Sequence, residues 1–237
     1  SEAGRWGPDE PHITTFSDGR FAVTHERLVS DPLGNGSLVD ETYIQYFNAD
    51  GSTSGDEEIL FRANSQSHEG TRISALSDDG IAASFGYSQA SGYGISTLSF
   101  DPDGTQRGVA PVEVSPSYGV SFSDLAGLDE NDYAVVWAQS DIDSNSYATM
   151  LRLFDADGIA RTQPIQMNQV EFGNENLPTL SVLTDGNIVA SWRSYQPSSS
   201  YFGTNTIEIY GRIFSPDGVA LGDEFQISSE SAGDGQF

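Results

Sequence analysis

Short runs of alternating apolar and polar residues make up most of this chain, and the runs end at Gly, Asp or Asn. The runs are rich in β-branched and aromatic residues, which is typical of half-buried β-strands. No stretch has the spacing of apolar residues that an amphipathic helix requires. We therefore expect an all-β protein.

The runs recur in a fixed order, which indicates an internal repeat. In each copy, one run follows a turn of Asp, Asn or Gly type and ends on a large ring; the copies are 21–25, 81–85, 133–137 and 188–192. The next run ends at an Asp-Gly turn, whose glycine is Gly51, Gly104, Gly158 or Gly218. Two motifs that recur in the same order make the repeat secure.

Each repeat holds four such runs, so we predict one four-stranded antiparallel sheet per repeat. A single sheet of this kind cannot bury both faces, whereas stacking several sheets around an axis buries them. The prediction is a β-propeller of four four-stranded antiparallel blades in a single domain, 1–237, with blades at approximately 11–66, 71–118, 122–170 and 177–229. A tandem β-sandwich is the alternative, although it does not explain four similar units.

The charge balance narrows the classes of partner. The 237 residues include 35 acidic and 10 basic residues, all of the latter arginine, and the formal charge is −25. This excess of negative charge argues against nucleic acid and against anionic membrane surfaces. There is no cysteine and no apolar run long enough to enter a membrane. The composition is typical of a secreted bacterial protein, so we expect an extracellular or cell-surface location.

The Asp-Gly turns have two interpretations. Asp-Gly between two strands is a strong hairpin signal, because glycine supplies the positive φ that such turns need. Calcium is the other interpretation, since two of the turns offer two carboxylates each, from Asp101, Asp103, Asp155 and Asp157. A calcium ion takes six to eight oxygens, so any Ca²⁺ bound here would be structural.

The connections at the opposite end of the predicted sheets vary in length and composition, as ligand-binding loops do. They span 26–42, 86–94, 138–147 and 193–206. Their Tyr, Ser, Gly and Asn residues are those of adaptable recognition surfaces. The candidate ligand contacts are Tyr87, Tyr93, Tyr195, Tyr201, Phe202, Asp141, Asp143 and Asn145. The rings would stack on sugars and the polar groups would bind hydroxyls; alternatively, the rings cover blade edges.

The fourth repeat carries the most complete form of a longer pattern, Leu-x-Asp-Gly…Trp, then Phe-x-x-Asp-Gly, then Gly-x-Glu-Phe. Its residues are Leu183, Asp185, Gly186, Trp192, Phe214, Asp217, Gly218, Gly222 and Phe225. This pattern resembles a repeat of very large secreted bacterial proteins of the RTX and adhesin type. The resemblance implies an extracellular, calcium-rich setting and a place in a longer multidomain chain. The first and second repeats depart from it, with His25 and Phe85 in the tryptophan position.

The sequence contains no nucleophile motif, phosphate-binding loop or metal-ligand spacing of histidines. We therefore predict no catalytic residues and no enzymatic activity. The predicted function is an adhesion or binding module that recognises a glycan or a cell-surface protein through the variable loops. The alternatives are a structural spacer in a giant surface protein and a glycoside hydrolase-like enzyme. Such an enzyme uses a pair of carboxylates, but no pair stands out in so acidic a chain.

Overall fold

A computed structural model describes residues 9–30, 38–62, 70–89, 92–115, 119–140, 147–169, 173–196 and 206–228. These residues form sixteen β-strands and one short 3-10 helix, Asp129–Asn131. The prediction of an all-β protein is confirmed. Within these ranges, no helix has the length and apolarity needed to cross a membrane.

The strands form four antiparallel groups of four, which we call sheets I to IV; the last two groups belong to one eight-stranded sheet. Sheet I comprises β1 (Asp9–Thr15), β2 (Phe21–Ser30), β3 (Leu38–Phe47) and β4 (Glu58–Arg62). Sheet II comprises β5 (Arg72–Ala75), β6 (Ile81–Gln89), β7 (Gly92–Phe100) and β8 (Gln106–Glu113). Sheet III comprises β9 (Val120–Gly127), β10 (Tyr133–Ser140), β11 (Tyr147–Phe154) and β12 (Ile165–Gln166). Sheet IV comprises β13 (Asn174–Val182), β14 (Ile188–Gln196), β15 (Thr206–Phe214) and β16 (Phe225–Gln226).

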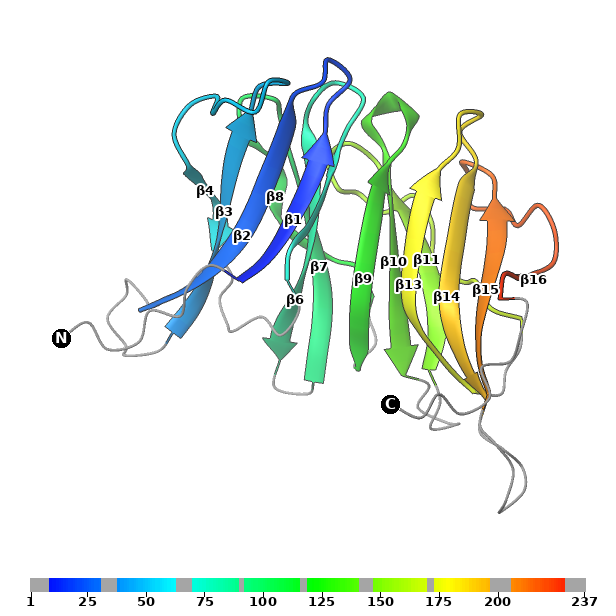
Figure 1. The fold of residues 1–237 in the computed structure, drawn as a ribbon. Coiled ribbons are helices and arrows are strands. Elements are labelled where there is room, and N and C mark those ends of the chain that lie inside the picture. The colour runs from blue at the N-terminus through cyan, green and yellow to red at the C-terminus, as the bar shows by residue number, and fades with distance from the viewer. Residues whose placement is uncertain are drawn as a thin grey trace.

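The sheets stand side by side in chain order, with sheets I and IV at the two ends of the row (Figure 1). Their first strands are neighbours: β1 contacts β5, β5 contacts β9, and β9 contacts β13. A single parallel bridge, between Tyr147 and Asn174, also joins sheet III to sheet IV. The first strand of each sheet therefore lies on the inner side of the row, where side chains from four distant segments converge.

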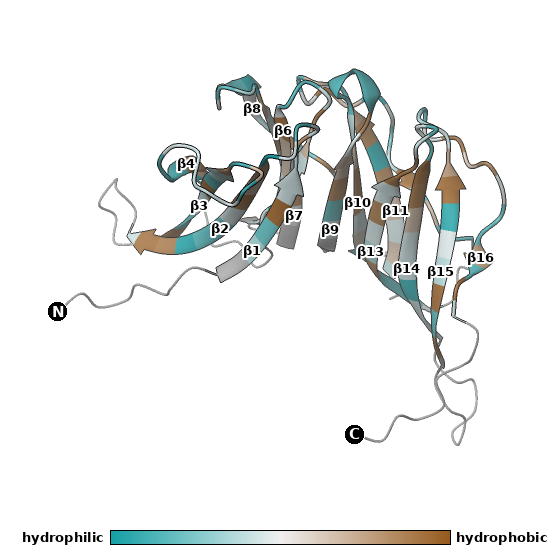
Figure 2. Ribbon diagram, turned by 45° about the horizontal axis from the view of Figure 1, so that its top comes forward, coloured by the Kyte–Doolittle hydropathy of each residue, from teal (hydrophilic) through white to brown (hydrophobic). Residues whose placement is uncertain are grey.

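Three apolar layers hold the row together, one between each pair of adjacent sheets. Hydrophobic segments recur along the strands (Figure 2). Successive side chains point to opposite faces of a sheet, and β10 is buried and apolar at every position from 133 to 138, so sheet III offers apolar side chains to both of its neighbours. Trp137 packs in the layer between sheets II and III, and Trp192 in the layer between sheets III and IV. Both rings are almost completely buried. The ring at this position is therefore a core residue in the second, third and fourth repeats, whereas His25 in the first repeat is partly exposed and contacts Glu57.

The outer face of sheet IV lacks the cover that the same face of sheet III has. Met167 follows β12 and is fully buried against sheet IV, whereas Ile227, at the matching place after β16, is 52% exposed. Thr149 in β11 is fully buried, whereas Ile209 at the matching place in β15 is 36% exposed. Within the described residues, the outer face of sheet IV therefore has no further sheet packed against it.

The Asp-Gly turns form tight hairpins with a left-handed glycine. Gly158 has a φ of +79°, and its N–H donates to the carbonyl of Asp155 at 2.9 Å. Gly218 has a φ of +80°, and a Cβ added there would lie 2.7 Å from the Cδ1 of Ile165. The hairpin interpretation of these turns therefore has a direct basis in backbone conformation and in packing between sheets.

Candidate functional site

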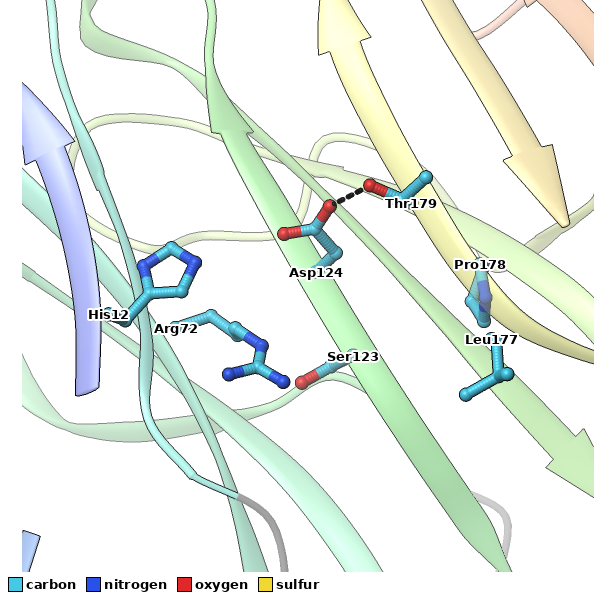
Figure 3. Close-up of a pocket in the computed structure, with 7 residues that line it drawn as sticks. All are labelled: His12, Arg72, Ser123, Asp124, Leu177, Pro178 and Thr179. Carbon is cyan, nitrogen blue, oxygen red and sulfur yellow. Dashed lines mark hydrogen bonds between the residues drawn. The ribbon is translucent and has the colours of Figure 1, made fainter. Parts of the chain in front are cut away.

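A cavity of about 310 Å³ lies between the first strands of the four sheets (Figure 3). We call it the axial cavity, and each of these strands contributes to its lining. The lining residues are His12, Arg72, Ser123, Asp124, Leu177, Pro178 and Thr179. Ligand sites are usually concave, with a few convergent polar groups. The axial cavity has both properties and is the candidate functional site.

Irregular strand pairing places these side chains at the cavity. The pairing of β1 with β2 shifts register just before His12. The pairing of β9 with β10 shifts next to Asp124, at Ser123. The pairing of β13 with β14 shifts across Leu177 and Pro178, where Leu177 has a φ of +52°. Bulges of this kind redirect side chains and are common next to active sites.

Asp124 joins two of the inner strands. Its Oδ2 accepts hydrogen bonds from the Thr179 hydroxyl at 2.6 Å and from the Leu180 N–H at 3.2 Å. Its Oδ1 accepts the N–H of Leu125 at 3.0 Å. Both carboxylate oxygens therefore already have donors, and these bonds fix the side chain on the cavity wall.

His12 is a neutral group on the opposite wall. The N–H of Ile73 donates to its Nδ1 at 3.2 Å, so the proton of the neutral ring lies on Nε2. Burial lowers the pKa of His12 from its ordinary value, and the positive charge of Arg72 lowers it further. The ring can therefore donate a hydrogen bond from Nε2 at neutral pH.

Glu175 is a buried acid on β13, two residues before Leu177. Only 2% of Glu175 is exposed, and burial raises its pKa to about 7. The Ser194 hydroxyl donates to its Oε1 at 2.9 Å, while Oε2 has no hydrogen-bond partner among the described residues. Glu175 is not among the residues that line the axial cavity.

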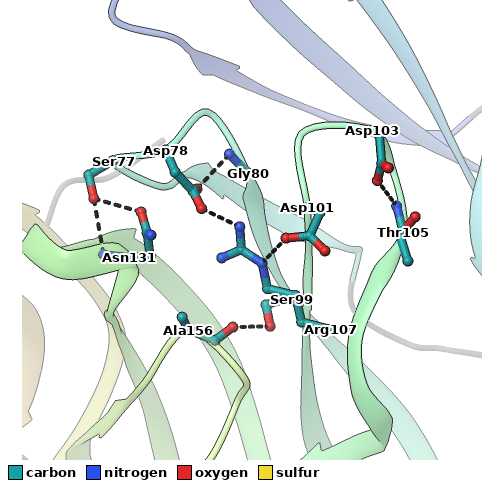
Figure 4. A network of polar contacts seen from close by, with 10 residues as sticks. All are labelled: Ser77, Asp78, Gly80, Ser99, Asp101, Asp103, Thr105, Arg107, Asn131 and Ala156. Carbon is teal, nitrogen blue, oxygen red and sulfur yellow. Dashed lines mark hydrogen bonds and ion pairs between the residues drawn. The ribbon is translucent and has the colours of Figure 1, made fainter.

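The carboxylates that the sequence nominated for calcium take part in turn and ion-pair contacts. Asp101 accepts a hydrogen bond from the Nε of Arg107 at 2.8 Å, and Arg107 also pairs with Asp78 (Figure 4). Asp103 accepts the N–H of Thr105 at 2.9 Å.

In the corresponding turn of sheet III, Asp155 accepts the N–H groups of Asp157 at 3.1 Å and of Ile159 at 2.8 Å. Across the described ranges, no three His, Asp or Glu side chains lie close enough together to hold a metal ion. The calcium site stays a prediction.

The predicted loop contacts are only partly within the described residues. Tyr87 lies on β6, where its hydroxyl donates to Glu113 at 3.1 Å, and Tyr195 lies on β14. Tyr93 lies on β7, and only its backbone is described. The remaining candidates lie outside the described residues: Asp141, Asp143, Asn145, Tyr201 and Phe202. Tyr87, Tyr93 and Tyr195 therefore belong to strands, because the strands run further than the sequence pattern indicated.

No motif in the sequence marks His12, Arg72 or Asp124 as functional residues. All three lie in the first of the four runs of a repeat, whose pattern predicts only a β-strand. Their position could have indicated a site, because all three are charged or titratable side chains in strands that meet at the axis of the predicted propeller.

No protein-family model matches the sequence, and no curated protein matches it. Solved structures do share its fold. The GH93 α-L-arabinofuranosidase of Fusarium graminearum, solved with arabinobiose, matches with a TM-score of 0.60 and 12% identity, over 94% of this chain and 67% of that one. An endo-arabinase from Bacteroides thetaiotaomicron matches with a TM-score of 0.56 and 16% identity, over 94% of this chain and 80% of that one.

An α-L-arabinanase from Penicillium chrysogenum, also solved with arabinobiose, matches with a TM-score of 0.60 and 12% identity, over 92% of this chain and 66% of that one. The chain has a β-propeller-like fold. At these identities the likeness concerns the fold alone.

These neighbours correct the predicted function. We predicted an adhesion module with no enzymatic activity, but the solved structures of this fold named above are glycoside hydrolases. The prediction of a non-enzymatic module is therefore wrong, and the glycoside hydrolase-like alternative agrees better with the comparison. The error came from the absence of a sequence motif, because a pair of catalytic carboxylates has no fixed spacing in sequence.

Proposed function

We propose that this chain is a glycoside hydrolase-like protein that binds a glycan in the axial cavity. The observation that carries the proposal is the position of the cavity: His12, Arg72 and Asp124 come from three different repeats and converge at the axis of a fold shared with arabinan-degrading enzymes. We also propose that sheets I to IV are four blades of a β-propeller.

The lining suits a sugar. The neutral ring of His12 and the hydroxyls of Ser123 and Thr179 can exchange hydrogen bonds with sugar hydroxyls, while Leu177 and Pro178 offer an apolar surface to the face of a sugar ring. Hydrolysis of a glycosidic bond uses a pair of carboxyl groups. Asp124 is the carboxylate that the described lining supplies, and we assign it to the reacting side of the cavity.

The proposal is tested with arabinobiose and with longer arabinan fragments. Calorimetry measures binding, and the release of reducing sugar measures hydrolysis. We expect the wild-type protein to bind and cleave. Asp124→Asn keeps the shape and one of the two acceptor oxygens, so it should retain binding within about threefold and lose at least about 100-fold in rate.

The matched control is Asp185→Asn, in the turn between β13 and β14 and outside the cavity lining, where the carboxylate accepts the N–H and side-chain amide of Asn187. This variant should keep the wild-type rate. A wild-type protein that neither binds nor cleaves any of these fragments would overturn the proposed function.

A further inference from the structure

Arg72 differs from every other arginine in the described part of the chain. The other eight arginines there each donate a hydrogen bond or form an ion pair. The side chain of Arg72 forms no hydrogen bond and no ion pair with any described residue, although the chain carries 35 acidic residues. Its guanidinium lies in the axial cavity beside the hydroxyl of Ser123 (Figure 3). A cation without a partner in a ligand cavity indicates an anionic group on the ligand.

Asp124, the carboxylate on the cavity wall, does not serve as the anionic partner of Arg72. Asp124 uses its oxygens for the hydroxyl of Thr179 and the N–H groups of Leu125 and Leu180. His12 contributes no charge, since its Nδ1 accepts a backbone N–H and its proton is on Nε2. Among the lining residues, Arg72 therefore carries the one charge that has no hydrogen-bond or ion-pair partner among the described residues.

We propose that the axial cavity recognises a sugar that carries a carboxylate, a uronate, through a paired hydrogen bond from Arg72. A guanidinium presents two parallel N–H donors that match the two oxygens of a carboxylate. A phosphate dianion is a poorer match, because it would place two negative charges beside Asp124 with a single arginine to offset them. The hydroxyl of Ser123 and the Nε2–H of His12 add neutral donors around the same site. This inference rests on the proposed function, and it names the class of glycan that the site takes.

The test compares two disaccharides at one ionic strength, about 0.15 M, where long-range repulsion by the acidic chain is largely screened. Digalacturonate carries carboxylates and arabinobiose is neutral. We expect the wild-type protein to bind digalacturonate more tightly. Arg72→Gln should weaken digalacturonate binding by about 10–100-fold and change arabinobiose binding by less than about threefold. Arg72→Lys should fall between the two, because it keeps the charge without the paired donors.

Arg20→Gln is the matched control, because Arg20 pairs with Asp18 and Asp79 in turns outside the cavity lining and its loss should leave both affinities unchanged. Equal affinity of the wild-type protein for the two disaccharides, or an Arg72→Gln variant that keeps its preference, would overturn the inference. So would tighter binding of glucose 6-phosphate than of digalacturonate.

The outcomes separate this inference from the proposed function. Cleavage of arabinan fragments without a preference for digalacturonate would leave the hydrolase proposal standing and refute the uronate. Binding of digalacturonate that depends on Arg72, without cleavage of any fragment, would support the uronate and refute the hydrolase. No binding of either disaccharide would refute both.

Discussion

Glu175 is an acid that the fold places where ionisation is costly. Its pKa is raised to about 7 by burial, against an ordinary value of 4.5. Below pH 4.5 the group is protonated in both the folded and the unfolded chain, and it does not affect the balance between them. As the pH rises toward 7, the unfolded chain loses the proton first, so the group increasingly favours unfolding.

We therefore expect Glu175→Gln to be more stable than the wild-type protein at pH 8 and equal to it near pH 4.5. The difference at pH 8 is on the order of 3 kcal/mol, from the change in pKa of this buried group. Urea unfolding at pH 4.5, 6 and 8 measures it. Glu58→Gln on an exposed part of β4 is the control and should show no such trend; equal stability of Glu175→Gln and wild type at pH 8 would show that Glu175 is solvated.

At the scale of the strand, residues at matching places in two repeats differ in how deeply they are buried. Met167 and Ile227 occupy matching places in sheets III and IV, but only Met167 is covered by a further sheet. Met167→Ala should cost about 2–5 kcal/mol, since it leaves a cavity in a packed layer. Ile227→Ala should cost less than about 1 kcal/mol, since half of the side chain is already in water.

Denaturant unfolding of the two variants makes the comparison within one molecule. Equal losses at the two positions would mean that the outer face of sheet IV is covered in solution. The same series at several protein concentrations would then show whether another copy of the chain provides the cover, because that stabilisation grows with concentration.

The sequence predicted the strands and the repeat because alternation is a local pattern, readable within a few residues. It did not predict the axial cavity, because His12, Arg72 and Asp124 are brought together only by the stacking of separate sheets. The register shifts around Ser123 and Leu177 also depend on pairing between strands. Only Pro178 indicates one of them in the sequence, because a proline within a strand favours a bulge. Tyr87 and Tyr195 were assigned to loops because turn-forming residues follow them, yet the pairing of their strands continues through them.

At the scale of the whole molecule, a formal charge of −25 opposes the compact state. Sodium chloride should therefore raise the thermal unfolding midpoint. Calcium chloride at the same ionic strength separates the two interpretations of the Asp-Gly turns: if Asp101, Asp103 and Asp155 serve only the contacts of their own turns, the rise is the same. Scanning calorimetry in the two salts makes the comparison. An additional rise of several degrees in calcium would show that the folded protein binds the ion.

The open outer face of sheet IV has a consequence for how chains of this kind change over evolutionary time. In the interior layers, a face with rings such as Trp192 meets the aliphatic face of the sheet before it. Sheet IV ends the row with the same aliphatic type of face, through Ile209 and Ile227. Duplication of one repeat would therefore supply a sheet whose ring-bearing face already matches the last one. The packing between adjacent sheets does not itself set their number, so gene duplication can add a sheet through the same kind of apolar layer.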